Sequence, residues 1–344
     1  MAEAFLRLNT KDRLDALGVA ADRFGRPAHL LEKDVWVVWA IQQLFGSPIG
    51  TNLVFKGGTS LSKAYRVIDR FSEDVDLTFD IRALIPDLLE GREDAMPATS
   101  SEERRWSKRV RQALPDWVAG TVQPILQQAI DREGIDASFR IDGDKLFVDY
   151  PHLARGTGYV SPSVMLDFGA RSTREPASPR DIVCDAASVI EGVEFPSACP
   201  RVMYAERTFW EKATAIHVFC LQNRMRGDRF SRHWHDVARL DDAGTAAAAI
   251  DDRAIAVAVA RHKTMVFSEK AANGGTVDYG AATAGHLQLV PSGEALNALA
   301  DDYRRMTEDG LLATSSEPFD VLMDRCSEIA LRANTLPILN RSVR

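Results

Sequence analysis

Two aspartates two residues apart, Asp74 and Asp76, lie in a segment whose apolar and polar residues alternate. This alternation, over residues 74–79, predicts a strand with one apolar face and one polar face. Side chains two residues apart on a strand point to the same side of the sheet. Carboxylate oxygens are the ligands that Mg²⁺ prefers, so the two aspartates could share a divalent cation. The spacing therefore predicts a metal site.

A glycine pair, Gly57 and Gly58, precedes this segment and follows a short predicted strand over residues 53–55. A short helix, opened by Thr59 or Ser60, is expected to follow the pair. Glycines at a helix start let backbone N–H groups approach a phosphate, with the positive end of the helix dipole behind them. This end of the unit therefore suits a triphosphate, and the aspartates suit the metal ions that bridge it.

A third carboxylate, Asp167, interrupts the apolar run of a predicted strand over residues 163–168. A lone carboxylate in an apolar strand is costly unless it is paired or bound to a metal. The alternative is an aspartate of an edge strand that faces water. The catalytic interpretation is favoured, because carboxylates in such unfavourable surroundings cluster at functional sites.

Two segments carry a resemblance to a known family: Phe-Lys-Gly-Gly-Thr-Ser-Leu at residues 55–61 and Arg-Phe-Ser-Glu-Asp-Val-Asp-Leu at residues 70–77. They closely resemble the AbiEii/AbiGii (MenT-type) toxins of the polymerase-β-like nucleotidyltransferase superfamily. The resemblance implies an α/β (α+β) fold, with a nucleotidyltransferase-type mixed sheet in the N-terminal part and a C-terminal helical bundle. It also implies that the strand of Asp167 lies beside the strand of the first two aspartates.

The resemblance implies a two-metal mechanism, in which Asp74, Asp76 and Asp167 hold two Mg²⁺ ions and Asp167 helps to deprotonate the acceptor hydroxyl. The β- and γ-phosphates of an NTP would be bound by four residues, namely Gly57, Gly58, Thr59 and Ser72.

A second half of the site is implied downstream, where a helix with Glu211-Lys212 and the later Arg232 and Asp236 match the family pattern. Lys212 would contact the nucleotide phosphates, and Asp236 would orient Lys212 or the substrate. Without the resemblance, a lysine on an apolar helix more often extends to water. A metal site at His233, His235 and Asp236 is not favoured, since residues two apart on a helix face different directions.

By resemblance, the protein is a nucleotidyltransferase that transfers NMP from an NTP to the 3′ end of tRNA, so that translation stops. A separately encoded antitoxin would hold it in check. One alternative is a related enzyme that modifies a protein hydroxyl or a small molecule. Others are a non-catalytic nucleotide-binding module, and an interaction protein whose aspartates merely border a strand.

The composition is that of a globular protein, with 344 residues, 45% hydrophobic and 26% charged. The net charge of −7 excludes a global basic field, so any RNA contact would use local basic patches at residues 104–111 and 224–232. The first patch is more simply a solvated helix face.

The four cysteines form no CxxC pair and are expected to be reduced thiols. No apolar run has membrane-spanning length and no signal peptide is recognisable, so a cytoplasmic protein is expected.

We predict a catalytic domain over residues 1–200 and a helical bundle over residues 201–344. A helix is expected over residues 29–45, a mobile loop or insertion over residues 81–106, and a hairpin around Asp142-Gly143-Asp144. The charged segment at residues 32–34 has two interpretations. It extends the family resemblance upstream, or it is a charged first turn of the helix.

Overall fold

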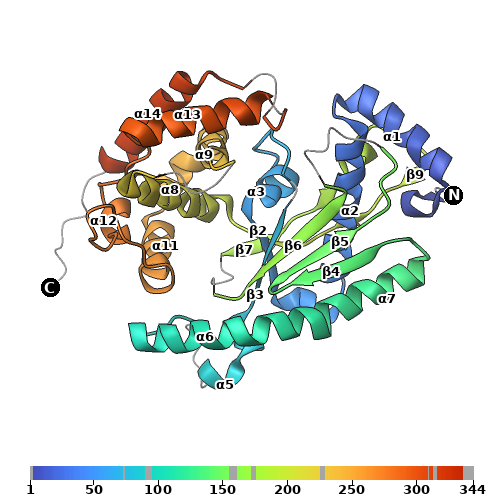
Figure 1. Cartoon of the computed structure of the whole chain (residues 1–344), viewed down its shortest axis with the longest axis horizontal. Helices are drawn as coiled ribbons and strands as arrows, with labels where there is room; N and C mark the ends of the chain where they lie inside the picture. The colour runs from blue at the N-terminus through green and yellow to red at the C-terminus, as the bar shows by residue number, and fades with distance from the viewer. Residues whose placement is uncertain are drawn as a thin grey trace. The chain divides into compact units, whose positions relative to one another are not determined.

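The structure, a computed structural model, describes residues 3–72, 74–89, 95–154, 161–171, 176–224, 229–308, 310–312 and 316–335. The chain packs into two compact units (Figure 1). The first consists of residues 1–66, 71–95 and 104–203, and the second of residues 67–70, 96–103 and 204–344. The predicted combination of a mixed sheet with a helical C-terminal part is confirmed.

The first unit is built on a seven-stranded sheet with the strand order β4-β5-β6-β3-β2-β11-β7. The strand β3 is parallel to β6 and antiparallel to β2, so the sheet is mixed. In chain order its strands are β2 (Leu53–Lys56), β3 (Val75–Phe79), β4 (Ser138–Asp142), β5 (Lys145–Asp149), β6 (Ser163–Gly169), β7 (Ala177–Pro179) and β11 (Arg201–Met203). The strands β1 (Glu3–Ala4) and β9 (Val193–Glu194) form one small separate sheet, and β8 (Ile182–Val183) and β10 (Ser197–Ala198) another.

The predicted hairpin and the three predicted site strands are present, with two differences. The strand β3 begins at Val75, so Asp74 precedes the strand instead of starting it. The strand β11, which pairs with β2 and β7, was not predicted, because three residues are too few for a recognisable alternation.

One face of this sheet is apolar and is covered by α2 (Ala28–Phe45), α6 (Ser100–Trp117) and α7 (Gln123–Glu133). Trp36 of α2 stacks on Tyr150 at the end of β5, with ring centroids 5.1 Å apart. Trp117 stacks on Phe79 of β3 at 4.2 Å. Successive side chains of a strand point to opposite faces. Since Phe79 faces the helices, Asp76 of the same strand lies on the other face. The α1 helix (Thr10–Phe24) packs on α2 and ends at Gly25.

The expected loop over residues 81–106 is largely wrong for the part of this segment that the structure describes. Residues 81–84 and 86–89 form the short helices α4 (Ile81–Leu84) and α5 (Pro86–Leu89), which bury Ile81, Ile85 and Leu89. Asp80 starts α4, because its side chain accepts the backbone N–H of Arg82. Residues 90–94 lie outside the described residues.

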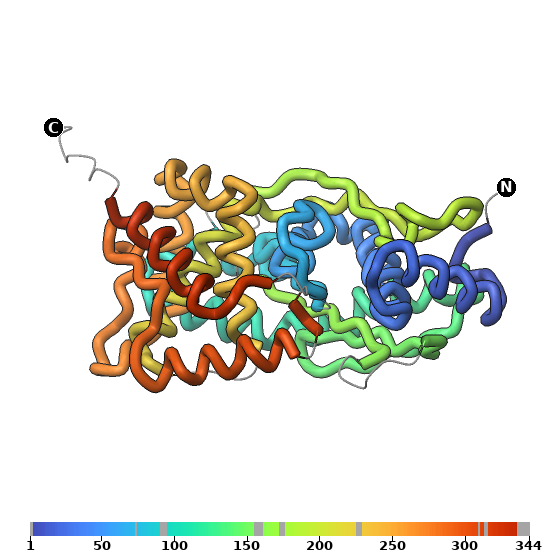
Figure 2. The backbone as a smooth tube through the Cα atoms, turned by 90° about the horizontal axis from the view of Figure 1, so that it is seen from above, coloured from blue at the N-terminus to red at the C-terminus, as the bar shows by residue number. Residues whose placement is uncertain are grey.

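The second unit is helical, as predicted (Figure 2). Its helices are α8 (Ala205–Gln222), α9 (Arg232–Asp242), α10 (Thr245–Asp251), α11 (Arg253–Val266), α12 (Tyr279–Thr283), α13 (Gly293–Glu308) and α14 (Phe319–Thr335). The Ala-rich segment over residues 245–266 is divided into α10 and α11 at Asp252, whose side chain accepts the N–H groups of Ala254 and Ile255 and so starts α11.

All four cysteines are free thiols, as expected. Within the described ranges, no helix combines the length and the apolar character that crossing a membrane requires.

Candidate functional site: a row of charges on the sheet and a buried aspartate cluster

Four charged residues face one another across four neighbouring strands of the first unit. Lys56 of β2 is the register partner of Asp76 of β3, Asp76 is the partner of Asp167 of β6, and Asp167 is the partner of Lys145 of β5. Residues directly opposite in a sheet project to the same side, with neighbouring strands roughly 4.8 Å apart. The two carboxylates therefore lie side by side on the face of the sheet opposite α2, α6 and α7, with a lysine on either side.

Gly57 brings the predicted phosphate-binding turn directly against Asp76. A Cβ atom added at Gly57 would lie 2.0 Å from Oδ2 of Asp76, and the backbone φ of Gly57 is +76°. Both facts require glycine at this position, because a side chain would collide with the carboxylate and would strain the backbone. The helix α3 (Gly57–Ser60) begins at this glycine, two residues earlier than predicted.

Thr59 fixes the segment that carries Asp74. The hydroxyl of Thr59 is buried, donates to the backbone carbonyl of Asp74 and lies 2.9 Å from the hydroxyl of Ser72. These bonds join the first turn after the glycine pair to the residues just before β3. The predicted nucleotide-binding residues Gly57, Thr59 and Ser72 thus lie together with Asp74 and Asp76, and their part in nucleotide binding stays a prediction.

Asp167 lies in surroundings that disfavour its negative charge. Burial raises the pKa of its carboxyl group, and Asp144 raises it further, against the attraction of Lys145. Nζ of Lys145 lies 3.5 Å from Oδ2 of Asp167, and the two side chains are 38% and 35% exposed. A half-exposed carboxylate with a raised pKa and one loosely held cation is suited to bind a metal ion or to accept a proton.

The donor set of Asp76 and Asp167 fits a divalent cation such as Mg²⁺, because two carboxylates on adjacent strands offer oxygen ligands on one face. Within the described ranges, however, no group of three or more His, Cys, Asp or Glu side chains is close enough to hold an ion. The structure therefore brings two of the three predicted carboxylates together as strand partners. The participation of Asp74 stays a prediction.

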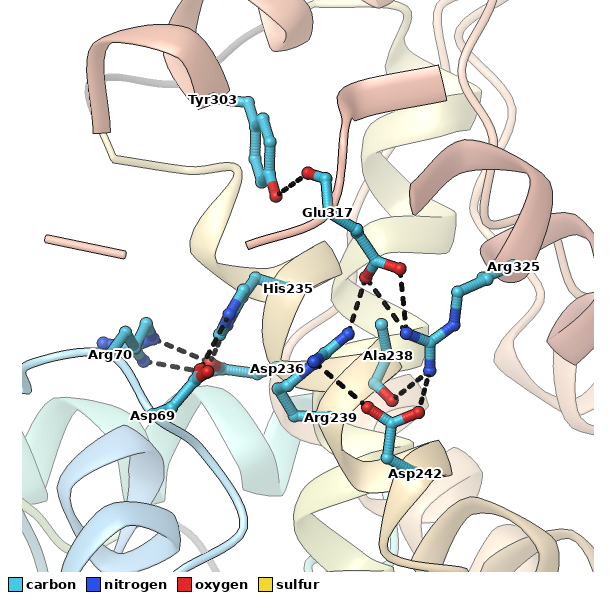
Figure 3. Close-up of polar contacts among 10 residues, drawn as sticks. All are labelled: Asp69, Arg70, His235, Asp236, Ala238, Arg239, Asp242, Tyr303, Glu317 and Arg325. Carbon is cyan, nitrogen blue, oxygen red and sulfur yellow. Dashed lines mark hydrogen bonds and ion pairs between the residues drawn. The ribbon is translucent and has the colours of Figure 1, made fainter. Parts of the chain in front are cut away.

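A different arrangement surrounds Asp236 in the second unit (Figure 3). Asp236 is completely buried and accepts two hydrogen bonds from Arg70, from Nε to Oδ1 at 2.7 Å and from Nη2 to Oδ2 at 2.8 Å. Nζ of Lys212 lies 2.8 Å from the same Oδ2 atom. The predicted pairing of Lys212 with Asp236 is thus present, and Arg70 is an additional partner.

Two cations hold the carboxyl group of Asp236 in its charged form. Burial acts to raise the pKa of Asp236, but the charges of Arg70 and Lys212 and the hydrogen bonds from Arg70 and His235 outweigh it and hold the pKa well below its usual range. One buried carboxylate thus contacts two buried cations. The contact of Lys212 with a phosphate stays a prediction.

His235 extends this cluster to Asp69. Its Nε2 atom lies 3.2 Å from Oδ1 of Asp69, and its Nδ1 atom 3.6 Å from Oδ1 of Asp236. Burial acts to lower the pKa of His235, yet the two carboxylates outweigh it and the pKa is raised. Burial and the nearby cations lower the pKa of His233 well below its usual value. Neither histidine belongs to a candidate metal site in the part of the chain that the structure describes.

A ring of ion pairs fixes the helix α9 that carries Asp236 (Figure 3). Arg239 contacts Asp242 at 3.2 Å and Glu317 at 2.7 Å, while Arg325 of α14 contacts Glu317 at 2.9 Å and also pairs with Asp242. The hydroxyl of Tyr303 donates to the backbone carbonyl of Glu317. These bonds join α9 to α14 and to residue 317, and so hold Asp236 in place.

The charged residues at the start of α2 are buried, so the interpretation as a charged first turn is wrong. Glu32 accepts backbone N–H groups from Leu153 and Ala154, and the ammonium group of Lys33 donates to the carbonyl of Ser161. Buried charges need partners, and these residues find them in segments that are distant in sequence. That dependence explains why the sequence did not reveal their burial.

Asp34 supports the segment after the glycine pair. Its Oδ1 atom lies 2.6 Å from Nζ of Lys63, which also donates to Oδ1 of Asp185 at 2.6 Å. Lys63 is buried in the π-helical turn at residues 61–65 that continues α3. Asp34 and Asp185 thus fix the helical segment that starts at Gly57, and the side chain of Lys63 has a structural role.

Sequence reasoning missed three cations of the two sites: Lys56, Lys145 and Arg70. Lys56 and Arg70 lie inside the recognised segments, but nothing in their spacing shows what they face. Lys145 lies in the predicted hairpin, and only the strand register places it opposite Asp167. His217 of α8 is buried, and its Nδ1 atom accepts the backbone N–H of Gln288.

The two arginine-rich segments differ in exposure. The basic residues of α6 are all exposed, as a solvated helix face requires: Arg104, Arg105, Lys108, Arg109 and Arg111. In the second segment Arg224 is exposed, Arg229 and Arg232 are half-buried, and Arg226 lies outside the described residues.

A comparison with known protein families shows the family of this chain. A family profile described as "Nucleotidyl transferase AbiEii toxin, Type IV TA system" matches residues 39–325. The protein is therefore a nucleotidyltransferase of the toxin class. More particularly, the chain belongs to the AbiEii toxin family of type IV toxin–antitoxin systems. The matched range includes the charge row of the sheet and the Asp236 cluster.

Among solved structures, the chain is similar to MenT4, a nucleotidyltransferase toxin from Mycobacterium tuberculosis H37Rv, with a TM-score of 0.45 and 16% identity over 93% of this chain and 90% of that chain. A comparison with curated protein sequences gave no significant match.

Proposed function

We propose that the protein transfers a nucleoside monophosphate from an NTP to the 3′ end of tRNA, in a reaction that requires Mg²⁺. The observation that carries this proposal is the pairing of Asp76 with Asp167 on adjacent strands, next to the glycine at which α3 begins. The family membership supports nucleotidyl transfer. The tRNA acceptor rests on the resemblance of the two sequence segments described above.

In this reaction the oxygen of the acceptor hydroxyl forms a bond to the α-phosphorus of the NTP. The bond between the α- and β-phosphates breaks, and pyrophosphate leaves with its negative charge. Asp167 accepts the hydroxyl proton, for which a raised pKa is suitable. Bound Mg²⁺ would neutralise charge on the triphosphate and polarise the acceptor oxygen.

The remaining residues bind and orient the substrate. Asp74, Asp76 and Asp167 would hold the metal ions, with Asp76 fixed against the backbone of Gly57. The N–H groups at Gly57 and Gly58, with the hydroxyls of Thr59 and Ser72, would bind the β- and γ-phosphates. Lys212, oriented by Asp236, would supply positive charge to the leaving pyrophosphate.

A direct test is to incubate the purified protein with total tRNA, Mg²⁺ and each α-³²P-labelled NTP in turn. We expect label in the tRNA band with at least one NTP, and none after EDTA treatment. Asp76→Asn should reduce labelling about a hundredfold or more, since it removes a metal ligand. Asp15→Asn is the matched control, because Asp15 is an exposed aspartate of α1 in the same unit.

The other candidate functions predict different results. Label in a polypeptide would show a protein hydroxyl as the acceptor. Binding of NTP with Mg²⁺ but no transfer to any acceptor would favour a nucleotide-binding module. Because the family belongs to toxin–antitoxin systems, we also infer a separately encoded antitoxin. Its coexpression should relieve the growth arrest that the protein causes when it is produced alone.

A further inference from the structure

Lys145, like Lys56 at the other end of the charge row, has no task in the sequence analysis or in the proposed function. It begins β5 directly after the hairpin turn, and its register partner on β6 is Asp167. Its ammonium group lies 3.5 Å from Asp167, and its side chain is 38% exposed. A contact of this length between half-exposed groups is weak, so the ammonium group is available for another anion.

The four residues of the charge row lie on neighbouring strands in the order β2, β3, β6 and β5, so Lys56 on β2 and Lys145 on β5 are its two ends. The phosphate-binding turn at Gly57 follows β2 and lies against Asp76, so the triphosphate belongs at the β2 and β3 end. Asp167, the proton acceptor of the proposed reaction, lies on the next strand, β6. Lys145 lies one strand beyond, on β5, which is three strands or roughly 14 Å from β2. A lysine at this end is placed for the acceptor and is too far for the β- and γ-phosphates.

We propose that Lys145 is an acceptor-binding residue, which pairs with Asp167 in the ion-free protein and binds a backbone phosphate of the RNA acceptor once Asp167 binds a divalent cation. This inference rests on the proposed function. Lysine is suited to the task, because its compact charge on a flexible stem can move between two anions without rearranging the sheet.

Two opposite effects follow from this proposal. In the ion-free protein Lys145 competes with the divalent cation for Asp167, so its removal tightens ion binding. In the complete reaction Lys145 holds the acceptor, so its removal weakens acceptor binding. A lysine that merely supports the hairpin would produce neither effect, and a lysine that binds the triphosphate would change the KM for the NTP.

The experiment compares the wild-type protein with Lys145→Met, Lys145→Arg and Lys11→Met. Lys11 is an exposed residue of α1 in the same unit, so its variant controls for the loss of one positive charge. Mn²⁺ affinity is measured by calorimetry without nucleotide or RNA. The KM values for total tRNA and for the NTP are measured separately, and thermal unfolding verifies that each variant is folded.

For Lys145→Met we expect Mn²⁺ to bind about two- to fivefold more tightly, the range expected for loss of a half-exposed ion pair. The KM for tRNA should rise roughly tenfold, as for the loss of one charge-assisted contact, with the KM for the NTP unchanged. Lys145→Arg should restore most of the tRNA affinity, and Lys11→Met should behave as wild type.

Unchanged Mn²⁺ affinity in Lys145→Met, or an increased KM for the NTP in place of the tRNA, would overturn the proposal. If the wild-type protein transfers no nucleotide to tRNA, the proposed function fails and the acceptor-binding role fails with it. The Mn²⁺ measurement would then still show whether Lys145 competes with a cation for Asp167, so the two failures are distinguishable.

Discussion

Asp167 on the sheet and Asp236 in the helical unit are the same residue type under opposite electrostatic conditions. Asp167 is half-exposed, lies near Asp144 and has one cation at 3.5 Å. Asp236 is fully buried and has two cations within 2.8 Å. The pKa of the first is raised and that of the second is held well below its usual range.

This difference shows which kind of ligand each region can accept. Around Asp167 the negative charge is compensated incompletely, so a divalent cation would improve the balance. Around Asp236 the carboxylate already contacts Arg70 and Lys212, so this region offers no free place for a cation. Nucleotidyl transfer involves two kinds of ligand, metal ions and a polyphosphate.

The largest expected effect is the loss of stability when the buried Asp236 is neutralised. Asp236→Asn leaves Arg70 and Lys212 buried without their counter-charge, and we expect the free energy of unfolding to fall by about 3–5 kcal/mol. The same change at the half-exposed Asp167 should cost less than about 1 kcal/mol. Urea unfolding followed by circular dichroism measures both variants. Equal losses of stability would remove the distinction between the two sites.

The second effect concerns the glycine that supports Asp76. Gly57→Ala places a Cβ atom where the carboxylate of Asp76 lies and forces alanine into a left-handed conformation. We expect a loss of about 1–3 kcal/mol in the free energy of unfolding, together with weaker Mn²⁺ binding. Gly18→Ala is the matched control.

Gly18 lies inside α1, and nothing is within 4 Å of an added Cβ atom, so its replacement by alanine should stabilise the protein by about 0.5–1 kcal/mol. Calorimetry with Mn²⁺ shows whether the change at Gly57 reaches the carboxylates. Normal Mn²⁺ affinity in Gly57→Ala would show that Asp76 does not need this contact.

The smallest expected effect is on the pH dependence of the free energy of unfolding. Rising pH should lower the contribution of His235, and falling pH should lower that of His217. The carboxylates of Asp69 and Asp236 raise the pKa of His235 despite its burial. Its contribution to stability is therefore complete below about pH 6.5 and is lost as the pH rises through the folded-state pKa. His235→Gln should abolish this loss above about pH 6.5.

His217 provides the contrast, since burial lowers its pKa and its Nδ1 atom accepts a hydrogen bond. It destabilises the fold as the pH falls below about 6.5, because only the unfolded chain binds the proton readily. His217→Gln should remove that loss on the acidic side. Urea unfolding of both variants at several pH values measures how each histidine changes the pH dependence of the free energy of unfolding. A change in the same direction for both variants would contradict the opposite pKa shifts.

Much of the site could be predicted from local patterns. The alternation around Asp76 identified β3, the apolar run around Asp167 identified β6, and the glycine pair marked the start of α3. The exact limits were less certain, since Asp74 precedes β3 and β11 was not anticipated. Short strands carry little periodicity, and the hydrogen bonds that define them come from neighbouring strands.

The partners of the charged side chains could not be predicted. In the sequence, Glu32 and Asp34 fit a charged first turn of a helix as well as they fit the family resemblance. Lys145 looks like an ordinary hairpin residue. Glu32 accepts from Leu153, Asp34 pairs with Lys63 and accepts from the distant Asp185, and Lys145 lies opposite Asp167 on the neighbouring strand. The sequence contains the charges, but burial and register decide which of them meet.

The sequence alone determined the class of the protein, because the order of apolar, glycine and acidic residues in two short segments is a local property. It also determined which carboxylates are candidates for catalysis. Only the tertiary structure decided that the pKa of Asp167 is raised, whereas Arg70 and Lys212 hold the pKa of Asp236 low. The reason is physical: an electrostatic environment depends on distances and burial, which arise when segments distant in sequence pack together.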